Sequence, residues 1–273
     1  MMKYDLIVSD YDHTLANKER NVSERNKQAI FDFQKKGGKF MLCTGRMFGS
    51  ARTVAKRIGL KGKIIAYNGA LIGDIESGEI YHHIFLDKQR AIDLLKKLEK
   101  ESEIVVRVFA NDVMYEKVEN PKLQIYADTY NVSFVVTHEP LCDYFSKNDI
   151  NITAIRAIAS PQKIIELYEK YRNLVSQAFS VFVSEASLLE FISPLANKGL
   201  AVQRYCEENG INRKKIACFG DNYNDIYMIE YAGLGVAVEN GVDEIKQKAD
   251  LVCPPNDSDG VGQIIEKIIR CEL

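Results

Sequence analysis

Several features that would mark other protein classes are missing from this chain of 273 residues. No apolar run approaches the roughly 18 residues that a membrane-spanning helix needs, so we expect no membrane partner. No basic segment with a long apolar stretch precedes the first strand-like run, so no signal peptide is predicted. The formal net charge of −2 gives no global field that would attract nucleic acid.

The cysteines also lack the spacing of a known site. None of the six forms a C-x-x-C pair, which argues against a zinc site, and a disulfide framework is not favoured either. We therefore expect buried free thiols in a reducing, cytoplasmic location. These cysteines are Cys43, Cys142, Cys206, Cys218, Cys253 and Cys271.

Strand-like and helix-like segments alternate at both ends of the chain. Apolar strands are predicted at 4–9, 39–43, 63–67, 215–219, 234–238 and 250–252, and helices at 23–36, 49–58, 198–208, 224–231, 243–249 and 261–269. Alternation of this kind is typical of an α/β fold, here a doubly wound, mainly parallel Rossmann-like sheet wrapped by helices.

The middle of the chain has a different pattern. Hairpins are predicted around Ser77-Gly78 and Asn111-Asp112, with further strands at 150–158, 179–183 and 188–192 and two helices at 88–100 and 161–171. This pattern indicates a separate α+β unit. We expect residues 1–81 and 191–273 to form one discontinuous α/β core, and residues 82–190 to form an inserted α+β unit.

Two carboxylates, Asp10 and Asp12, directly follow the first apolar run. Residues two apart in an extended chain point to the same side, and ligands of open α/β sheets bind at the carboxyl ends of the strands. One carboxylate could attack phosphorus while the other protonates the leaving oxygen and later activates water. A turn in which the aspartates bond their own backbone would use the same residues. The pair alone leaves both interpretations open.

Two further clusters offer groups that suit a phosphate. Thr44-Gly45-Arg46 follows the second strand, and a threonine hydroxyl beside bare backbone amides suits a phosphate oxygen. Arg46 could reach a substrate anion or pair with an acid. Lys198 begins a predicted helix, where its charge opposes the helix dipole, and this favours a partner such as a carboxylate or a phosphate. The alternatives are a simple strand-to-helix turn for Thr44-Gly45-Arg46 and a solvated lysine for Lys198.

The segment Gly220-Asp221-Asn222-Tyr223-Asn224-Asp225 is the most specific local pattern. Asp221 and Asp225 are four residues apart at the start of a predicted helix, so they share a face. Hard oxygen ligands crowded at a sheet edge suit magnesium, whereas a helix cap with an acidic first turn is the alternative. All four clusters follow strands or begin helices at what should be one sheet edge, which favours a common site.

Together these motifs resemble the haloacid dehalogenase superfamily of phosphohydrolases over essentially the whole chain. The resemblance is closer to its Cof-type branch, which carries an α+β cap inserted after the third strand. The four motifs occur in the order of that family. Asn68-Gly69-Ala70 and Asp259-Gly260-Val261 resemble further segments of the branch.

The resemblance implies a role for each motif. Asp10 would be the nucleophile and Asp12 the general acid and base, with Thr44 and Lys198 completing the catalytic group. Mg²⁺ would be held by Asp10, the backbone carbonyl of Asp12, Asp221 and, directly or through water, Asp225. The residues expected to bind the substrate or its phosphate are Thr44, Gly45, Arg46, Lys198 and Asn224.

His13 departs from the family pattern, which usually has glycine at this position. Glycine tolerates positive φ, where histidine pays a steric cost. The substitution is either a tolerated change in a loop or a means of placing an imidazole near the site, which would alter the pH dependence.

The sequence therefore predicts a magnesium-dependent phosphatase that hydrolyses a small phosphorylated metabolite, such as a sugar phosphate or a phosphorylated cofactor, through an aspartyl phosphate. A phosphotransferase or phosphomutase would use the same intermediate with a sugar hydroxyl as acceptor, and a non-catalytic phosphate-ligand sensor is a further alternative. The cap is expected to select the leaving group. Neither the substrate nor the oligomeric state can be read from the sequence.

Overall fold

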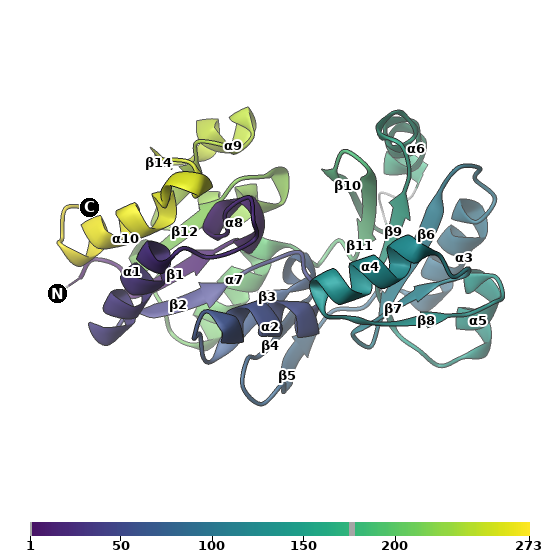
Figure 1. Ribbon diagram of the computed structural model, residues 1–273, viewed down its shortest axis with the longest axis horizontal. Helices are drawn as coiled ribbons and strands as arrows, with labels where there is room; N and C mark the ends of the chain where they lie inside the picture. The colour runs from purple at the N-terminus through teal and green to yellow at the C-terminus, as the bar shows by residue number, and fades with distance from the viewer. Residues whose placement is uncertain (1, 175–177) are drawn as a thin grey trace. The chain divides into compact units, whose positions relative to one another are not determined.

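The chain forms two compact units, whose helices and strands are labelled in Figure 1. The structure is a computed structural model that describes residues 2–174 and 178–273. The core unit consists of Met1–Arg46, Ala51–His82 and Asn197–Leu273, and the inserted unit consists of Met47–Ser50 and His83–Ala196. The chain therefore leaves the core unit and returns to it.

A five-stranded parallel sheet forms the centre of the core unit, in the order β14-β13-β12-β1-β2. Leu6 of β1 pairs with Ile216 on one side and with Lys39 on the other. The mainly parallel sheet predicted from the sequence is confirmed. The strands are β1 (Leu6–Ser9), β2 (Lys39–Leu42), β12 (Ile216–Gly220), β13 (Leu234–Val238) and β14 (Leu251–Cys253).

Helices cover both faces of this sheet (Figure 1). On one face α7, α8 and α9 bury an apolar cluster that includes Val202 and Met228 against Leu6 and Val8. On the other, α1 and α10 pack side by side, α1 against β2 and α10 against β14. Ser23 caps α1 by accepting a hydrogen bond from the backbone N–H of Asn26. The helices are α1 (Glu24–Lys35), α2 (Phe48–Arg57), α7 (Lys198–Glu208), α8 (Ile226–Tyr231), α9 (Asp243–Lys248) and α10 (Gly260–Ile269).

The third predicted strand belongs to a different sheet, which corrects the sequence-based prediction. β3 (Lys63–Ala66) pairs antiparallel with β4 (Leu71–Asp74), and β4 pairs with β5 (Ile80–His83) across the predicted hairpin. The reason is the tight turn at 67–69, which reverses the chain directly after β3. A single parallel bridge between Cys43 and Ile65 keeps β3 beside the chain that follows β2.

The inserted unit is built on a six-stranded sheet in the order β10-β11-β9-β6-β7-β8, antiparallel except for the pair β7 and β8. Over its described residues, 83–174 and 178–196, it carries four helices where the sequence predicted two. Helix α4 buries few residues and leaves a weak apolar period, and α5, with seven residues, is too short for a period to be read. Its elements are α3 (Lys88–Leu98), β6 (Val105–Ala110), β7 (Val113–Glu116), α4 (Pro121–Tyr130), β8 (Ser133–Val136), α5 (Leu141–Lys147), β9 (Ile152–Ile158), α6 (Pro161–Leu174), β10 (Ser180–Glu185) and β11 (Leu188–Ile192).

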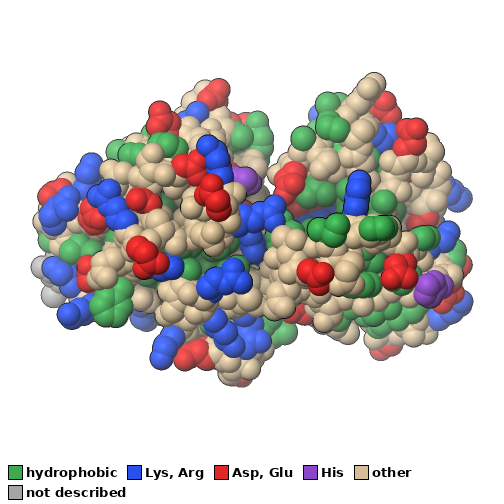
Figure 2. Space-filling view, in the orientation of Figure 1, with side chains coloured by type: hydrophobic (Ala, Val, Ile, Leu, Met, Phe, Trp, Pro, Cys, Tyr) green, Lys and Arg blue, Asp and Glu red, His purple; other side chains and the backbone are tan. Residues whose placement is uncertain are grey.

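The surface and the thiols fit an ordinary globular protein. Basic and acidic side chains are interspersed over the face shown in Figure 2. All six cysteines are free thiols, and five are buried as predicted, whereas Cys271, near the end of the chain, is exposed. Within the described part of the chain, each helix is too short or too polar to cross a membrane.

Candidate active site

The sheet topology brings two of the predicted motifs together. The chain runs from β1 to β2 on one side of the sheet and from β12 to β13 and β14 on the other, so the strand order reverses between β1 and β12. Ligands of open α/β sheets bind at such a switch point, outside the carboxyl ends of the strands. Asp10 directly follows β1 and Asp221 directly follows β12, and the backbone N–H of Asp10 donates to the carbonyl of Phe219 at 3.0 Å.

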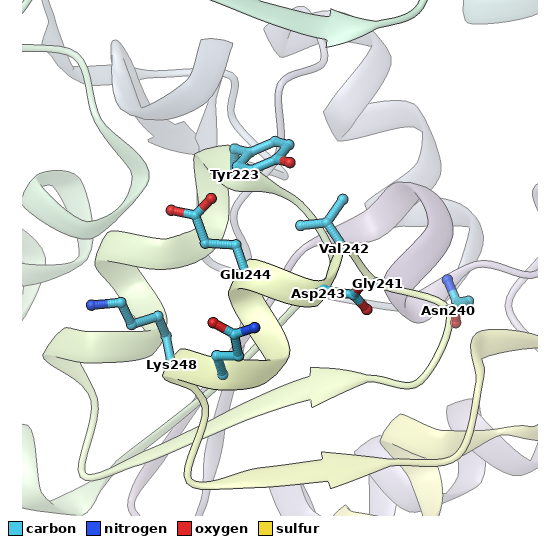
Figure 3. A pocket seen from close by; sticks show the side chains of 8 residues that line it. Tyr223, Asn240, Gly241, Val242, Asp243, Glu244 and Lys248 are labelled. Atoms are coloured by element: carbon cyan, nitrogen blue, oxygen red, sulfur yellow. The ribbon is translucent and has the colours of Figure 1, made fainter.

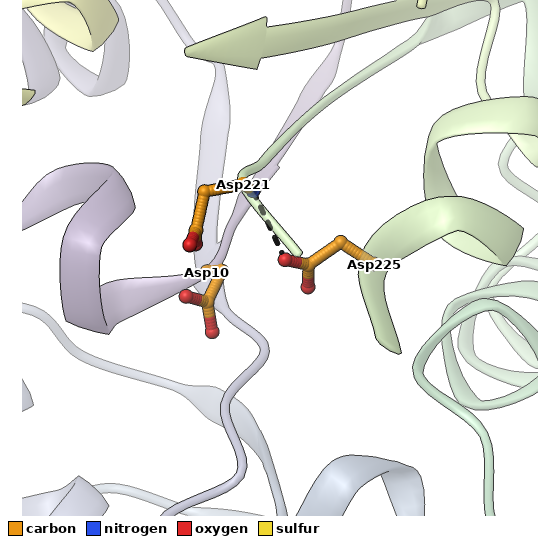
Figure 4. A group of neighbouring side chains, drawn as sticks. All are labelled: Asp10, Asp221 and Asp225. Atoms are coloured by element: carbon orange, nitrogen blue, oxygen red, sulfur yellow. Dashed lines mark hydrogen bonds between the residues drawn. The ribbon is translucent and has the colours of Figure 1, made fainter. Parts of the chain in front are cut away.

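Three carboxylates converge at this point (Figure 4). Asp10, Asp221 and Asp225 each place one oxygen within 4.8 Å of the others, and all three are buried. Burial raises the pKa of Asp10 well above its usual range, although Lys198 opposes the shift. Burial, reinforced by Asp225, raises the pKa of Asp221 to about 7. Such crowding of negative charge calls for a compensating cation.

Lys198 supplies part of that compensation. Its Nζ donates to Asp10 Oδ1 and to Asp225 Oδ1, each at 2.6 Å, and its side chain is 1% exposed. Burial alone would lower the pKa of Lys198, but Asp10 and Asp225 outweigh it and raise the pKa. Asn197 fixes the start of α7 by accepting from the backbone N–H groups of Gly199 and Leu200. The lysine at this helix start thus has two buried carboxylate partners.

Asp225 has both carboxylate oxygens engaged. Oδ1 binds Lys198, and Oδ2 accepts from the backbone N–H groups of Asp221 and Asn222, each at 3.1 Å. Asn222 completes a reciprocal cap with Asp225. Asp225 therefore braces the loop that carries Asp221.

The donor set fits a hard divalent cation. Carboxylate oxygens are the ligands that such ions prefer, and three of them converge here. Thr14, which the sequence did not single out, is fully buried and donates its hydroxyl to Asp221 Oδ1 at 2.6 Å. This bond orients Asp221 and leaves its other oxygen for a ligand. The contribution expected from Asp12, through its backbone carbonyl, stays a prediction.

Asp12 and the loop after β2 form a second group. Arg46 donates from Nε and Nη2 to the two carboxylate oxygens of Asp12, so it pairs with one of the two predicted acids that follow β1. Thr44 is buried, and its hydroxyl oxygen accepts from the backbone N–H of Arg46 at 3.2 Å. Asn224, the remaining predicted phosphate contact, donates from Nδ2 to Asn68 Oδ1 at 2.9 Å.

His13 adopts the left-handed backbone for which glycine is suited, with φ 62° and ψ 0°. Its side chain is exposed, and its carbonyl oxygen accepts from Asn240 Nδ2 at 2.8 Å. His13 therefore has the left-handed backbone conformation that suits glycine, even though it carries a side chain.

A hollow lies beside the site along α9 (Figure 3). Tyr223, Asn240 and Glu244 are among the residues that line it, and its lining includes none of the three converging carboxylates. It is therefore distinct from the switch-point site.

Comparison with known proteins agrees with this geometry. The haloacid dehalogenase-like hydrolase family matches residues 7–265. A phosphatase of Bacillus subtilis, YwpJ, is 28% identical, over 97% of this chain and 99% of its own. A phosphoglycolate phosphatase of Archaeoglobus fulgidus is 26% identical, over 97% of both chains.

The solved structure of a haloacid dehalogenase-like hydrolase from B. subtilis has a TM-score of 0.86 at 28% identity, covering 96% of this chain and 99% of its own. These similarities confirm the family, the fold class and the phosphoric monoester hydrolase class predicted from the sequence. With motifs, topology and site in agreement, the chain belongs to the haloacid dehalogenase-like hydrolases.

Proposed function

We propose that the chain is a Mg²⁺-dependent phosphatase that hydrolyses a small phosphorylated metabolite through an aspartyl phosphate. The observation that carries the proposal is the buried group of Asp10, Lys198, Asp221 and Asp225 at the switch point of the sheet. Asp10, Asp221 and the backbone carbonyl of Asp12 would hold the metal, with Asp225 supporting them. A bound Mg²⁺ would offset negative charge around the phosphoryl group.

The residues divide the chemistry between them. Asp10 attacks phosphorus, the bond from phosphorus to the ester oxygen breaks, and Asp12 gives its proton to the departing oxygen. Water then attacks the phosphorus of the aspartyl phosphate and loses a proton to Asp12, which releases inorganic phosphate and restores Asp10. Lys198 balances the charge of Asp10 and the phosphoryl oxygens. Thr44 and the amides beside Gly45 hold the phosphate, with Arg46 and Asn224 at the rim.

The substrate proposal follows from two observations. The site is built from charged side chains, and the core unit that carries it is interrupted by a second, α+β unit. One relative is named for phosphoglycolate and another for 5-amino-6-(5-phospho-D-ribitylamino)uracil, so related chains differ in their leaving groups. Residues 82–190 act, in this proposal, as the cap that selects the leaving group. The free cysteines are consistent with the cytoplasm as the place of action.

The test is phosphate release by purified protein, screened across phosphorylated metabolites with Mg²⁺. Asp10→Asn should abolish turnover, whereas Asp149→Asn, at a fully exposed side chain, should match the wild type. Excess EDTA should silence the enzyme, and added Mg²⁺ should restore it. Normal turnover by Asp10→Asn would refute the nucleophile, and turnover that requires a sugar acceptor would identify a phosphotransferase instead.

A further inference from the structure

Three consecutive residues between β3 and β4 have left-handed backbone. The φ angles are 49° for Tyr67, 54° for Asn68 and 96° for Gly69. A residue with a Cβ is disfavoured in this conformation, and asparagine tolerates it better than most. Strained backbone persists only where the surrounding structure holds it, and it clusters at functional sites.

The turn is tied to the loop after β2. The backbone N–H of Tyr67 donates to the carbonyl of Arg46 at 2.9 Å, and that of Asn68 donates to the carbonyl of Thr44 at 3.0 Å. The side chain of Asn68 also packs on Gly45 so closely that a Cβ there would lie 2.9 Å from Asn68 Oδ1. A side chain at position 45 would therefore displace the Asn68 amide, and the proposed phosphate-binding loop rests on this turn.

The same turn reaches the other two motif segments. Asn68 Oδ1 accepts from Asn224 Nδ2 at 2.9 Å, beside Asp225. A Cβ on Gly69 would lie 2.3 Å from the carbonyl oxygen of Asn197, the cap residue that precedes Lys198. One short turn therefore contacts the segments that carry the threonine, the lysine and the asparagine of the site.

We propose that Asn68 is a positioning residue of the active site. Asn68, which is 3% exposed, sets the spacing between the Thr44 loop and Asn224 and, by accepting from Asn224 Nδ2, fixes the orientation of that amide. Asn68 acts through these two residues and need not touch the reacting atoms. The inference rests on the proposed function, because it assigns Thr44 and Asn224 to phosphate binding.

The first test is Asn68→Gly, which accepts the left-handed backbone and removes the side chain alone. Its kcat for p-nitrophenyl phosphate should fall roughly 10-fold to 100-fold, since a misplacement of about 1 Å costs that order of rate. The matched control is Asn131→Gly, at an exposed asparagine with φ 51° at the end of α4, which should keep the wild-type kcat. Both are assayed well below their melting temperatures. A wild-type kcat for Asn68→Gly would overturn the proposal.

A double-mutant cycle with Asn224→Ala separates positioning from general damage. If the two side chains act as a unit, the double variant should lose no more kcat than the worse single variant. Fully multiplicative losses would contradict the coupling.

Calorimetric binding of inorganic phosphate in the presence of Mg²⁺ gives a readout that does not need turnover. Asn68→Gly should weaken phosphate binding at least tenfold relative to Asn131→Gly. A wild type that binds phosphate and hydrolyses no ester would refute the proposed function while still testing Asn68. Equal phosphate affinity in the two glycine variants would refute the role of Asn68.

Discussion

Arg46 binds both carboxylate oxygens of Asp12, from Nε at 2.7 Å and from Nη2 at 2.6 Å. The two residues follow neighbouring strands, β1 and β2. The guanidinium also lies over the ring of Tyr11, 4.7 Å from its centroid, which limits the ways in which it can turn. The group proposed as the proton carrier is therefore held in one orientation by a planar, two-point contact.

Replacement of Arg46 should reveal this orientation in the dependence on the leaving group. In Arg46→Met, the kcat/KM for an alkyl phosphate should fall about 100-fold or more, the scale of lost general acid catalysis. The loss for p-nitrophenyl phosphate should be much smaller, because nitrophenolate leaves without a proton. Arg172→Met, at an exposed arginine of α6, is the control. Equal losses on both esters would show that Arg46 serves binding and not the proton transfer.

Loss of Lys198 should destabilise the core unit. Lys198→Met leaves Asp10 and Asp225 without their shared cation in a buried site, and breaking a buried pair costs about 3–5 kcal/mol. Urea unfolding of the variant measures this change in free energy. Lys18→Met, which removes an exposed pair with Asp257, should leave the free energy of unfolding unchanged. A Lys198→Met protein as stable as the wild type would mean that the carboxylates are protonated or separated.

Thr14 should contribute to metal affinity without contacting the metal. Its hydroxyl favours the ionised form of Asp221, the form that binds a cation. Thr14→Val keeps the shape and removes the hydrogen bond, so Mg²⁺ affinity should weaken roughly 10-fold to 100-fold, as for other groups that support metal ligands. Calorimetry with Thr14→Ser as the control, which retains the hydroxyl, measures the effect. The idea fails if valine and serine bind Mg²⁺ equally well.

His13 should prove replaceable. His13→Gly relieves the left-handed strain but frees the unfolded chain, so the free energy of unfolding should change by less than about 1 kcal/mol. Because the imidazole is exposed, the pH profile of kcat should coincide with that of the wild type. A shifted profile would show that the imidazole takes part in the reaction.

The sequence was sufficient to predict the helices and strands whose apolar residues form a strong pattern. Strands β1, β12 and β13 are continuous apolar runs, and α1 has both a capping serine and a clear buried face. Helix α4 buries only Leu123 and Ala127, so its period is nearly invisible, and it was missed. The sheet to which β3 belongs depends on the turn at 67–69, and period alone does not determine a strand's neighbours.

Part of the candidate site could likewise be predicted from the sequence, and part could not. The spacing of aspartates on strand ends was enough to predict that the Asp10 and Asp221 segments meet, because parallel strands share an edge. It did not predict that Arg46 would choose Asp12, or that Thr14 would bind Asp221. Those contacts join side chains that are distant along the chain, and the amino-acid sequence alone is equally compatible with many other pairings.

The position of β1 in the sheet has a consequence for how the protein is made. Its neighbour β2 begins at Lys39, but its other neighbour β12 begins only at Ile216. A nascent chain that is still extending the inserted unit thus carries β1 with one edge unpaired, and unpaired edges invite pairing with other chains. The core unit closes only after the inserted unit has been synthesised. A truncation before Ile216 would therefore yield an aggregation-prone fragment and not a smaller enzyme.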